Sequence, residues 1–163
     1  MRVADPLWDE PLSGEHARQR GGRWNPPGSF AVVYLNDSVE RARAQLRHRL
    51  ERRGIRPEDL DPEAGPVLVH TRVPDDEYVD AVSAESVREL GLPATYPLGD
   101  DGALVGHHVC QPIGQAAWDA GERGIACRSA ASSAPAEAEE LAFFVRRRRL
   151  RLQRSDRFAD WYW

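Results

Sequence analysis

The sequence predicts an α+β fold, and three observations support this. The chain has 163 residues, 41% of them hydrophobic and 29% charged, which suits one domain with its own core. Short apolar runs typical of strands are interspersed with segments of helical spacing. These segments do not follow a strict strand–helix–strand order, which favours α+β over a regular α/β fold. We therefore expect one domain over residues 1–163.

The first segment with a defined conformation is the loop of residues 21–29, GGRWNPPGS. Its prolines fix φ and its glycines allow conformations closed to other residues, so the loop should have one shape. Residues 30–35 follow as a short apolar run with β-branched side chains. This pattern predicts a buried strand directly after the loop.

A helix is expected next, from Asp37 or Ser38 to about residue 53. Either side chain can cap its first turn, and Glu40, three residues after Asp37, resembles the second half of a capping box. Gly54 is suited to end the helix. Four apolar residues stand at helical spacing and predict its buried face: Val39, Ala42, Leu46 and Leu50.

The remaining elements alternate less regularly. We expect strands at 66–73, 124–127, 141–145 and 149–152, helices at 83–90 and 112–120, a loop at 92–107 and a polar turn at 128–135. Pro112 suits the first turn of its helix and Gly121 the position after its end. In residues 149–152 leucine alternates with arginine, which favours a strand with one solvated face over a phosphate-binding cluster. The aromatic closing residues 160–163 should pack on the domain.

Composition excludes several classes of function. The net charge of -4 gives no general attraction to nucleic acid, although all 22 basic side chains are arginine. The arginine-only composition is best explained by a coding bias. Cys110 and Cys127 are too few for a disulfide framework and fit buried thiols in a reducing compartment. The longest apolar run is residues 30–35, so we expect neither signal peptide nor membrane span, and a cytoplasmic location.

The adjacent histidines His107 and His108 raise the question of a metal site. Neighbouring side chains point apart on any regular element, and no third ligand stands at a matching spacing. The sequence therefore predicts no metal.

Several motifs together resemble the RES-domain family, which is named for an arginine, a glutamate and a serine. The loop GGRWNPPG, the run VVYL and the helix that follows are similar to the start of such domains, and GERGIACRS resembles the block that ends in the serine. The resemblance assigns the arginine to Arg23, with Trp24 beside it. It assigns the strand tyrosine to Tyr34 and the serine to Ser129. Gln45 stands where the family has glutamate.

The resemblance implies an ADP-ribosyltransferase-like fold, two small twisted sheets flanked by helices around an NAD cleft. It implies NAD as substrate, in a glycohydrolase, phosphorylase or ADP-ribosyltransferase. It also implies a toxin held by an antitoxin with a helix-turn-helix domain. Water, phosphate or a protein target could each be the acceptor. Homo-oligomerisation stays open.

The chemistry of NAD cleavage indicates what each residue would do. Nicotinamide leaves as a neutral group, so the main demand is to stabilise the positive charge that develops on the ribose. Arg23 can hold the pyrophosphate through paired hydrogen bonds. Tyr34 and Trp24 can stack on nicotinamide, although Trp24 could also fill the core. Ser129 can hydrogen-bond a ribose hydroxyl or the amide.

Gln45 departs from this scheme because an amide carries no charge. Glu40 cannot replace it, since five residues place it roughly 140° around the helix. The sequence leaves open whether an acid from Glu137, Glu139 or Glu140 supplies the charge. It also leaves open whether Gln45 marks a weakened enzyme, an altered or purely binding role, or an engineered change.

Overall fold

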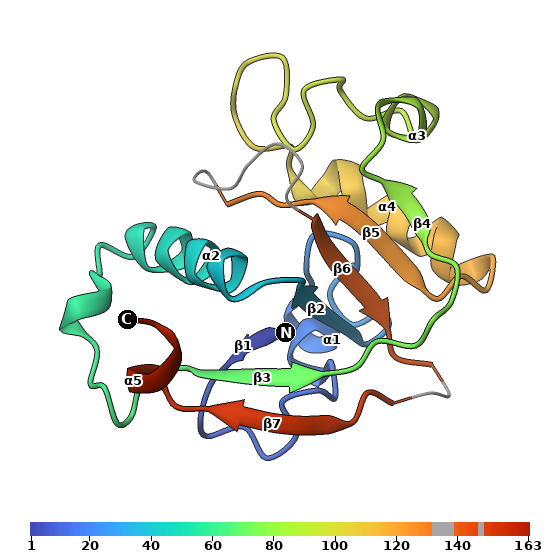
Figure 1. The fold of residues 1–163 in the computed structure, drawn as a ribbon. Coiled ribbons are helices and arrows are strands. Elements are labelled where there is room, and N and C mark those ends of the chain that lie inside the picture. The colour runs from blue at the N-terminus through green and yellow to red at the C-terminus, as the bar shows by residue number, and fades with distance from the viewer. Residues whose placement is uncertain (132–138, 147–148) are drawn as a thin grey trace.

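The computed structural model describes residues 1–131, 139–146 and 149–163, and in these ranges the chain forms two antiparallel-based sheets (Figure 1). The three-stranded sheet has the order β1 (Arg2–Ala4), β3 (Val67–Thr71) and β7 (Leu152–Asp156). The four-stranded sheet has the order β2 (Val32–Asn36), β6 (Glu139–Phe144), β5 (Gly124–Arg128) and β4 (Val79–Ala81). Only the β4–β5 pair is parallel among these pairs. The predicted α+β class with two flanked sheets is confirmed.

Helices flank the two sheets. They are α1 (Glu15–Arg20), α2 (Val39–Glu51), α3 (Ala84–Glu89), α4 (His107–Asp119) and α5 (Phe158–Trp161), with a 3₁₀ turn η1 at Pro57–Asp59. Figure 1 shows α4 behind β4 and β5, whereas α2 lies over the side that holds the C-terminus and α5. The end of β2 and the start of β6 therefore lie between two groups of helices.

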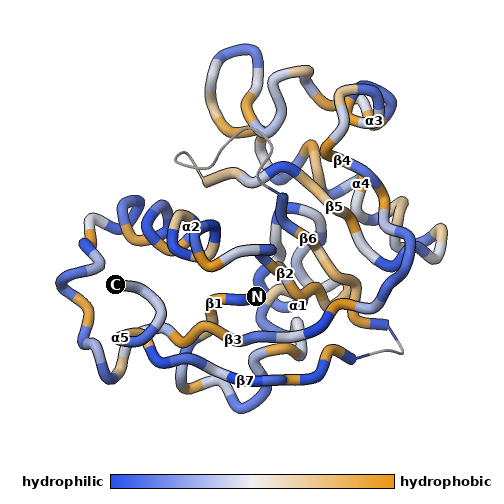
Figure 2. The backbone as a smooth tube through the Cα atoms, in the orientation of Figure 1, coloured by the Kyte–Doolittle hydropathy of each residue, from blue (hydrophilic) through white to orange (hydrophobic). Residues whose placement is uncertain are grey.

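Strand β2 separates two apolar clusters by the alternation of its side chains. Val33 and Leu35 belong to the cluster shared with the three-stranded sheet, which includes Val69. Val32 and Tyr34 point to the opposite face, where α4 and the loop of residues 21–29 cover the four-stranded sheet. In Figure 2, hydrophobic colours follow these strands into the interior. The second face is the one that carries the candidate site.

Helix α2 begins as the sequence predicts, with Ser38 rather than Asp37 as its cap. Ser38 has extended backbone angles, and its Oγ accepts the N–H of Arg41 at 3.2 Å. Asp37 instead forms an exposed ion pair with Arg41. The buried residues of the helix are Ala42, Leu46 and Leu50, as expected from their spacing. They pack on α5 and β3 residues in the third cluster of the core.

Two expected elements have different bounds. Helix α4 begins at His107, five residues before Pro112, which lies inside it. Pro112 lacks the N–H for one helical bond, but Cys110 in the preceding turn is fully buried, and its packing favours the earlier start. The strand expected at residues 149–152 is also wrong. Leu150 is buried but Leu152 is 55% exposed, so the two leucines do not share a face, and β7 begins only at Leu152.

Two of the three closing aromatic residues pack in the core of their own chain, as predicted, whereas Trp163 is 60% exposed. Trp161 and Tyr162 are buried, and the Trp161 indole donates to the Pro66 carbonyl at 2.9 Å. Arg43 on α2 donates to the carbonyl oxygens of Trp161 and Trp163 at 2.8 and 3.1 Å. The C-terminal segment is thereby fixed to α2. Part of the turn expected at residues 128–135 lies outside the described residues.

Candidate active site

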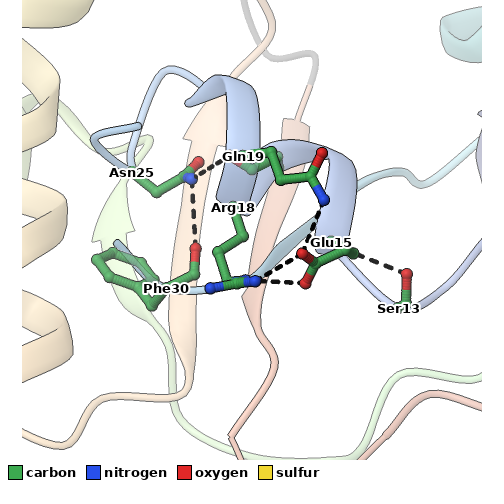
Figure 3. Close-up of polar contacts among 7 residues, drawn as sticks. Ser13, Glu15, Arg18, Gln19, Asn25 and Phe30 are labelled. Carbon is green, nitrogen blue, oxygen red and sulfur yellow. Dashed lines mark hydrogen bonds and ion pairs between the residues drawn. The ribbon is translucent and has the colours of Figure 1, made fainter. Parts of the chain in front are cut away.

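The loop of residues 21–29 is anchored from within. Asn25 is fully buried, and its Nδ2 donates to the carbonyl oxygens of Ala17 at 2.7 Å and Phe30 at 3.3 Å (Figure 3). The backbone N–H of Gly28 donates to the Arg18 carbonyl at 2.7 Å. These bonds join the middle of the loop and its C-terminal part to α1. The loop therefore has the single conformation that its prolines and glycines predict.

Tyr34 on β2 supports the middle of this loop. Its phenol oxygen accepts the backbone N–H of Trp24 at 2.9 Å and donates to Asn25 Oδ1 at 2.9 Å. Gly22 lies directly on the ring, where a Cβ atom would overlap the phenol. The tyrosine is thus part of the platform that positions Arg23.

Trp24 occupies the core and not the surface. Its side chain is fully buried, and its indole Nε1 donates to Cys127 Sγ at 3.2 Å. The residue can be so deep because Gly114 of α4 touches its carbonyl group, a place where any Cβ would overlap. A ring without an exposed face cannot stack on a ligand in this conformation. We correct the expected stacking role of Trp24 to one of support.

Arg23 is partly exposed beside this core. Its Nη1 donates to the phenol oxygen of Tyr96 at 3.4 Å, a contact between segments 73 residues apart. Burial alone would lower the pKa of Arg23. The net shift is nevertheless upward, because Tyr96, Cys127 and the carboxyl of Glu140 favour the charged guanidinium. Arg23 therefore remains a cation suited to a phosphate group.

Ser129, just after β5, faces an acid on the neighbouring strand. Its side chain is buried, and Oγ donates to Glu140 Oε1 over a short 2.5 Å. The same Oγ accepts the N–H of Ala131 at 3.3 Å. Glu140 is itself only 9% exposed. The serine predicted for the site is thus coupled to a buried carboxylate.

Gln45 meets this group through an intermediate side chain. Its Oε1 accepts Asn36 Nδ2 at 3.1 Å, and Asn36 is the cross-strand partner of Glu140. Directly opposite residues of an antiparallel pair have side chains on the same face. Gln45 therefore lies at the margin of the cluster, on α2, whereas Glu40 is exposed on that helix.

The cluster has a low-dielectric interior. Burial, followed by the charge of Glu140, raises the pKa of Cys127 to about 12, so this thiol stays protonated. Burial is also the main cause that raises the pKa of Tyr34. Burial and the cations Arg23 and Arg52 lower the pKa of His107, which favours the neutral imidazole at the start of α4. Cys127 and Tyr34 are therefore neutral here, whereas Arg23 carries a charge.

Of the residues expected in the site, the structure brings Arg23, Tyr34 and Ser129 to one end of the four-stranded sheet, with Gln45 at its margin. The sequence does not single out Tyr96 and Asn36, and it gives Glu140 only as one of three acids. The sequence does contain a signal for Glu140. Glu140, Ala142 and Phe144 are alternate residues of β6, and Ala142 and Phe144 are buried, so Glu140 faces the core as well. Glu137 lies outside the described residues.

Other features lie away from this cluster. A surface hollow of about 680 Å³ lies at the other end of the four-stranded sheet, near the start of β2 and the end of β6. Its lining includes Trp8, His16, Ala31 and Val145. It contains none of the expected site residues. In the described part of the chain, no three His, Cys, Asp or Glu side chains are grouped to hold a metal ion. No helix found there has the length and apolar character needed to span a membrane.

The two sheets with their flanking helices form a fold that is shared with known proteins. Residues 1–160 match the model of the RES domain, and the chain belongs to the RES-domain family. Its relatives include proteins named NAD(+) phosphorylase MbcT, from Mycobacterium bovis and from two strains of Mycobacterium tuberculosis. Each is 32% identical over 114 residues, which make up 70% of this chain and 58% of the relative. The match thus spans little more than half of those proteins.

A solved structure extends the likeness over most of the fold. A chain in the crystal structure of the M. tuberculosis MbcT–MbcA toxin–antitoxin complex superposes with a TM-score of 0.78 at 27% identity. The superposition covers 96% of this chain and 81% of that chain. The two sheets described above are therefore shared with a protein of known structure.

Proposed function

We propose that this chain cleaves the bond between nicotinamide and ribose in NAD and transfers the ADP-ribosyl group to phosphate. In this reaction the glycosidic C–N bond breaks and nicotinamide leaves with the bonding electrons. A phosphate oxygen then forms the new bond to the same ribose carbon. The named activity of the MbcT relatives supports this choice of substrate and acceptor.

The observation that carries the proposal is the convergence of chemically suited side chains from three separate segments. Arg23 comes from the loop before β2, Tyr34 from β2, and Ser129 from the position just after β5. We assign the pyrophosphate to Arg23, because a charged guanidinium can donate two parallel hydrogen bonds to phosphate oxygens. Tyr34 would line the nicotinamide position, and Ser129 would orient a ribose hydroxyl.

The test is to mix the purified protein with NAD, with and without phosphate, and to measure nicotinamide and ADP-ribose phosphate by mass spectrometry. Nicotinamide release that depends on phosphate supports a phosphorylase. Release into water alone would make the chain a glycohydrolase. Binding of NAD without release would favour a non-catalytic NAD-binding module, which the uncharged Gln45 makes the second candidate. Absence of both binding and release would overturn the proposal.

Arg23→Ala tests the assigned clamp. Loss of hydrogen bonds to a charged group should weaken NAD binding by about 1.5–3 kcal/mol in calorimetry. Arg72→Ala is the matched control, since Arg72 is an exposed arginine just after β3. Equal effects of the two substitutions would remove Arg23 from the site.

We further propose that a protein antitoxin, of the helix-turn-helix type, holds the activity in check. The toxin–antitoxin complex of the structural relative supports an antitoxin as partner, and the helix-turn-helix type is implied only by the family resemblance. Expression of this chain alone should slow growth in proportion to the fall of cellular NAD. Co-expression of the product of an adjacent gene should restore growth, whereas unimpaired growth with NAD intact would contradict a toxin role.

A further inference from the structure

The proposed reaction needs a negative group near the ribose, and the side chain at position 45 does not supply one. Charge that develops on the ribose in the transition state is stabilised by a preorganised opposite charge. Gln45 offers an amide whose oxygen is already bound to Asn36 at 3.1 Å. Among the acids in the described part of the chain, Glu140 is the one that shares the cluster with Arg23 and Ser129.

The sheet fixes the position of Glu140. It lies on β6, the strand between β2 and β5, and its cross-strand partners are Asn36 on one side and Cys127 on the other. Backbone ladders on both sides hold its Cα in place. Tyr34 lies two residues before Asn36, so it shares this face of the sheet. Glu140 therefore points to the face where the loop presents Arg23.

Among the described residues, the hydrogen bonding of the carboxylate uses only one of its two oxygens. Ser129 Oγ donates to Oε1 at 2.5 Å, and within the described residues Oε2 accepts no hydrogen bond. The charge of Glu140 also reaches its neighbours. It favours the cationic form of Arg23 and contributes, after burial, to the raised pKa of Cys127. The Arg23 guanidinium and the Glu140 carboxylate thus lie in the same cluster.

We propose that Glu140 is a catalytic residue of this chain, whose carboxylate stabilises the ribosyl cation in place of the family glutamate that Gln45 replaces. This inference rests on the proposed function. Glu140 transfers no proton in this role. Its Oε2 faces the ribosyl cation or accepts a hydrogen bond from a ribose hydroxyl, while Ser129 donates a hydrogen bond to Oε1. In this chain the negative charge is supplied from strand β6, whereas the family glutamate would supply it from helix α2. Asn36 lies between the two positions.

The alternative is that Glu140 only positions Ser129 and the residues after it. Glu140→Gln separates the two roles, because a glutamine of the same shape can still accept the Ser129 hydrogen bond but has no charge. We expect nicotinamide release to fall by roughly 10²–10³-fold in kcat, with NAD affinity changed by less than about threefold. Glu139→Gln is the control: it removes an exposed carboxylate from the preceding position of β6 and should leave the rate unchanged.

The reciprocal substitution gives a second, independent measurement. If Glu140 supplies the charge, Gln45→Glu in the otherwise unchanged protein should raise the rate by less than about tenfold. In the Glu140→Gln variant, the added Gln45→Glu change should raise the rate of nicotinamide release at least about tenfold over that of Glu140→Gln alone. Thermal unfolding of each variant shows whether it is folded. Should Glu140→Gln fail to fold, a large gain from Gln45→Glu alone would still contradict the proposal.

The outcomes separate this inference from the proposed function. Turnover by the unchanged protein that Glu140→Gln does not reduce would overturn the role of Glu140 and leave NAD cleavage standing. No turnover by the unchanged protein would remove both.

Discussion

The phenol oxygen of Tyr34 accepts the backbone N–H of Trp24 at 2.9 Å, and this bond joins β2 to the loop that carries Arg23. The same phenol donates to Asn25 Oδ1, so one hydroxyl group serves two loop residues. The position of Arg23 depends on a hydroxyl as well as on an aromatic ring.

Tyr34→Phe should therefore destabilise the protein, although it keeps the ring. Two buried polar groups lose their partner, which costs roughly 1–3 kcal/mol. Urea unfolding followed by tryptophan fluorescence measures the loss. Tyr78→Phe is the control, because it removes a phenol hydrogen bond to the Pro74 carbonyl away from the site. Tyr78→Phe should leave NAD turnover intact, and a Tyr34→Phe protein as stable and active as the parent would refute the platform.

Gly114→Ala tests the close approach of α4 to Trp24. In an exposed helix this change would stabilise by about 1 kcal/mol. Here the added methyl group would overlap the Trp24 carbonyl, so we expect a net loss of roughly 1–3 kcal/mol in unfolding free energy. Ala116→Gly, at an exposed position of α4, reports the propensity effect alone. A more stable Gly114→Ala protein would show that the helix can move away at little cost.

Ser38→Ala and Asp37→Ala separate the two residues that the sequence offers as caps of α2. Ser38 accepts the Arg41 N–H, so its loss should cost about 1 kcal/mol. Asp37 forms an exposed ion pair with the same arginine, and its removal should cost under about 0.5 kcal/mol. Chemical denaturation of both variants gives the comparison. The reverse order would assign the cap to Asp37.

Asp80 gives a prediction for pH. Hydrogen bonds from Ser83 and from the backbone of Val82 and Ser83 lower the pKa of Asp80 from 3.8 to about 2. A depressed folded pKa contributes stability that is present above about pH 4 and lost as pH falls towards 2. Asp80→Asn should thus lower stability at pH 7, by under about 1 kcal/mol because the group is exposed. The difference in stability between Asp80→Asn and the parent should vanish near pH 2. Thermal unfolding at pH 7 and pH 2 measures it, and a difference that persists at pH 2 would contradict the prediction.

The sequence predicts the elements with strong periodicity and misses those without it. The strand at 30–35 and the helix capped by Ser38 are recognisable because apolar spacing and capping agree. Strands β1 and β4 have three residues each, too few for a pattern. Strand β7 is mostly exposed, so hydrophobic alternation gives no signal for it.

The site is predicted in part for a similar reason. Arg23, Tyr34 and Ser129 follow from local motifs, and the structure places them together. From the sequence Trp24 could either stack on a ligand or fill the core. Local reasoning does not decide between the two, because the burial of Trp24 depends on Gly114, ninety residues away in the chain. The pairing of Glu140 with Ser129 likewise depends on the register of β5 and β6.

Helix α4 and the loop of residues 21–29 are joined at more than one place. Gln111 donates to the carbonyl oxygens of Gly22 and Asn25 at 3.0 and 3.3 Å, one turn before the contact between Gly114 and Trp24. A glycine- and proline-rich surface loop is ordinarily among the first segments to open. Here the amide protons of Gly22 and Trp24 should exchange with deuterated solvent as slowly as those in the middle of α4. The arginine would then be presented by a unit that opens only when the helix itself detaches from the sheet.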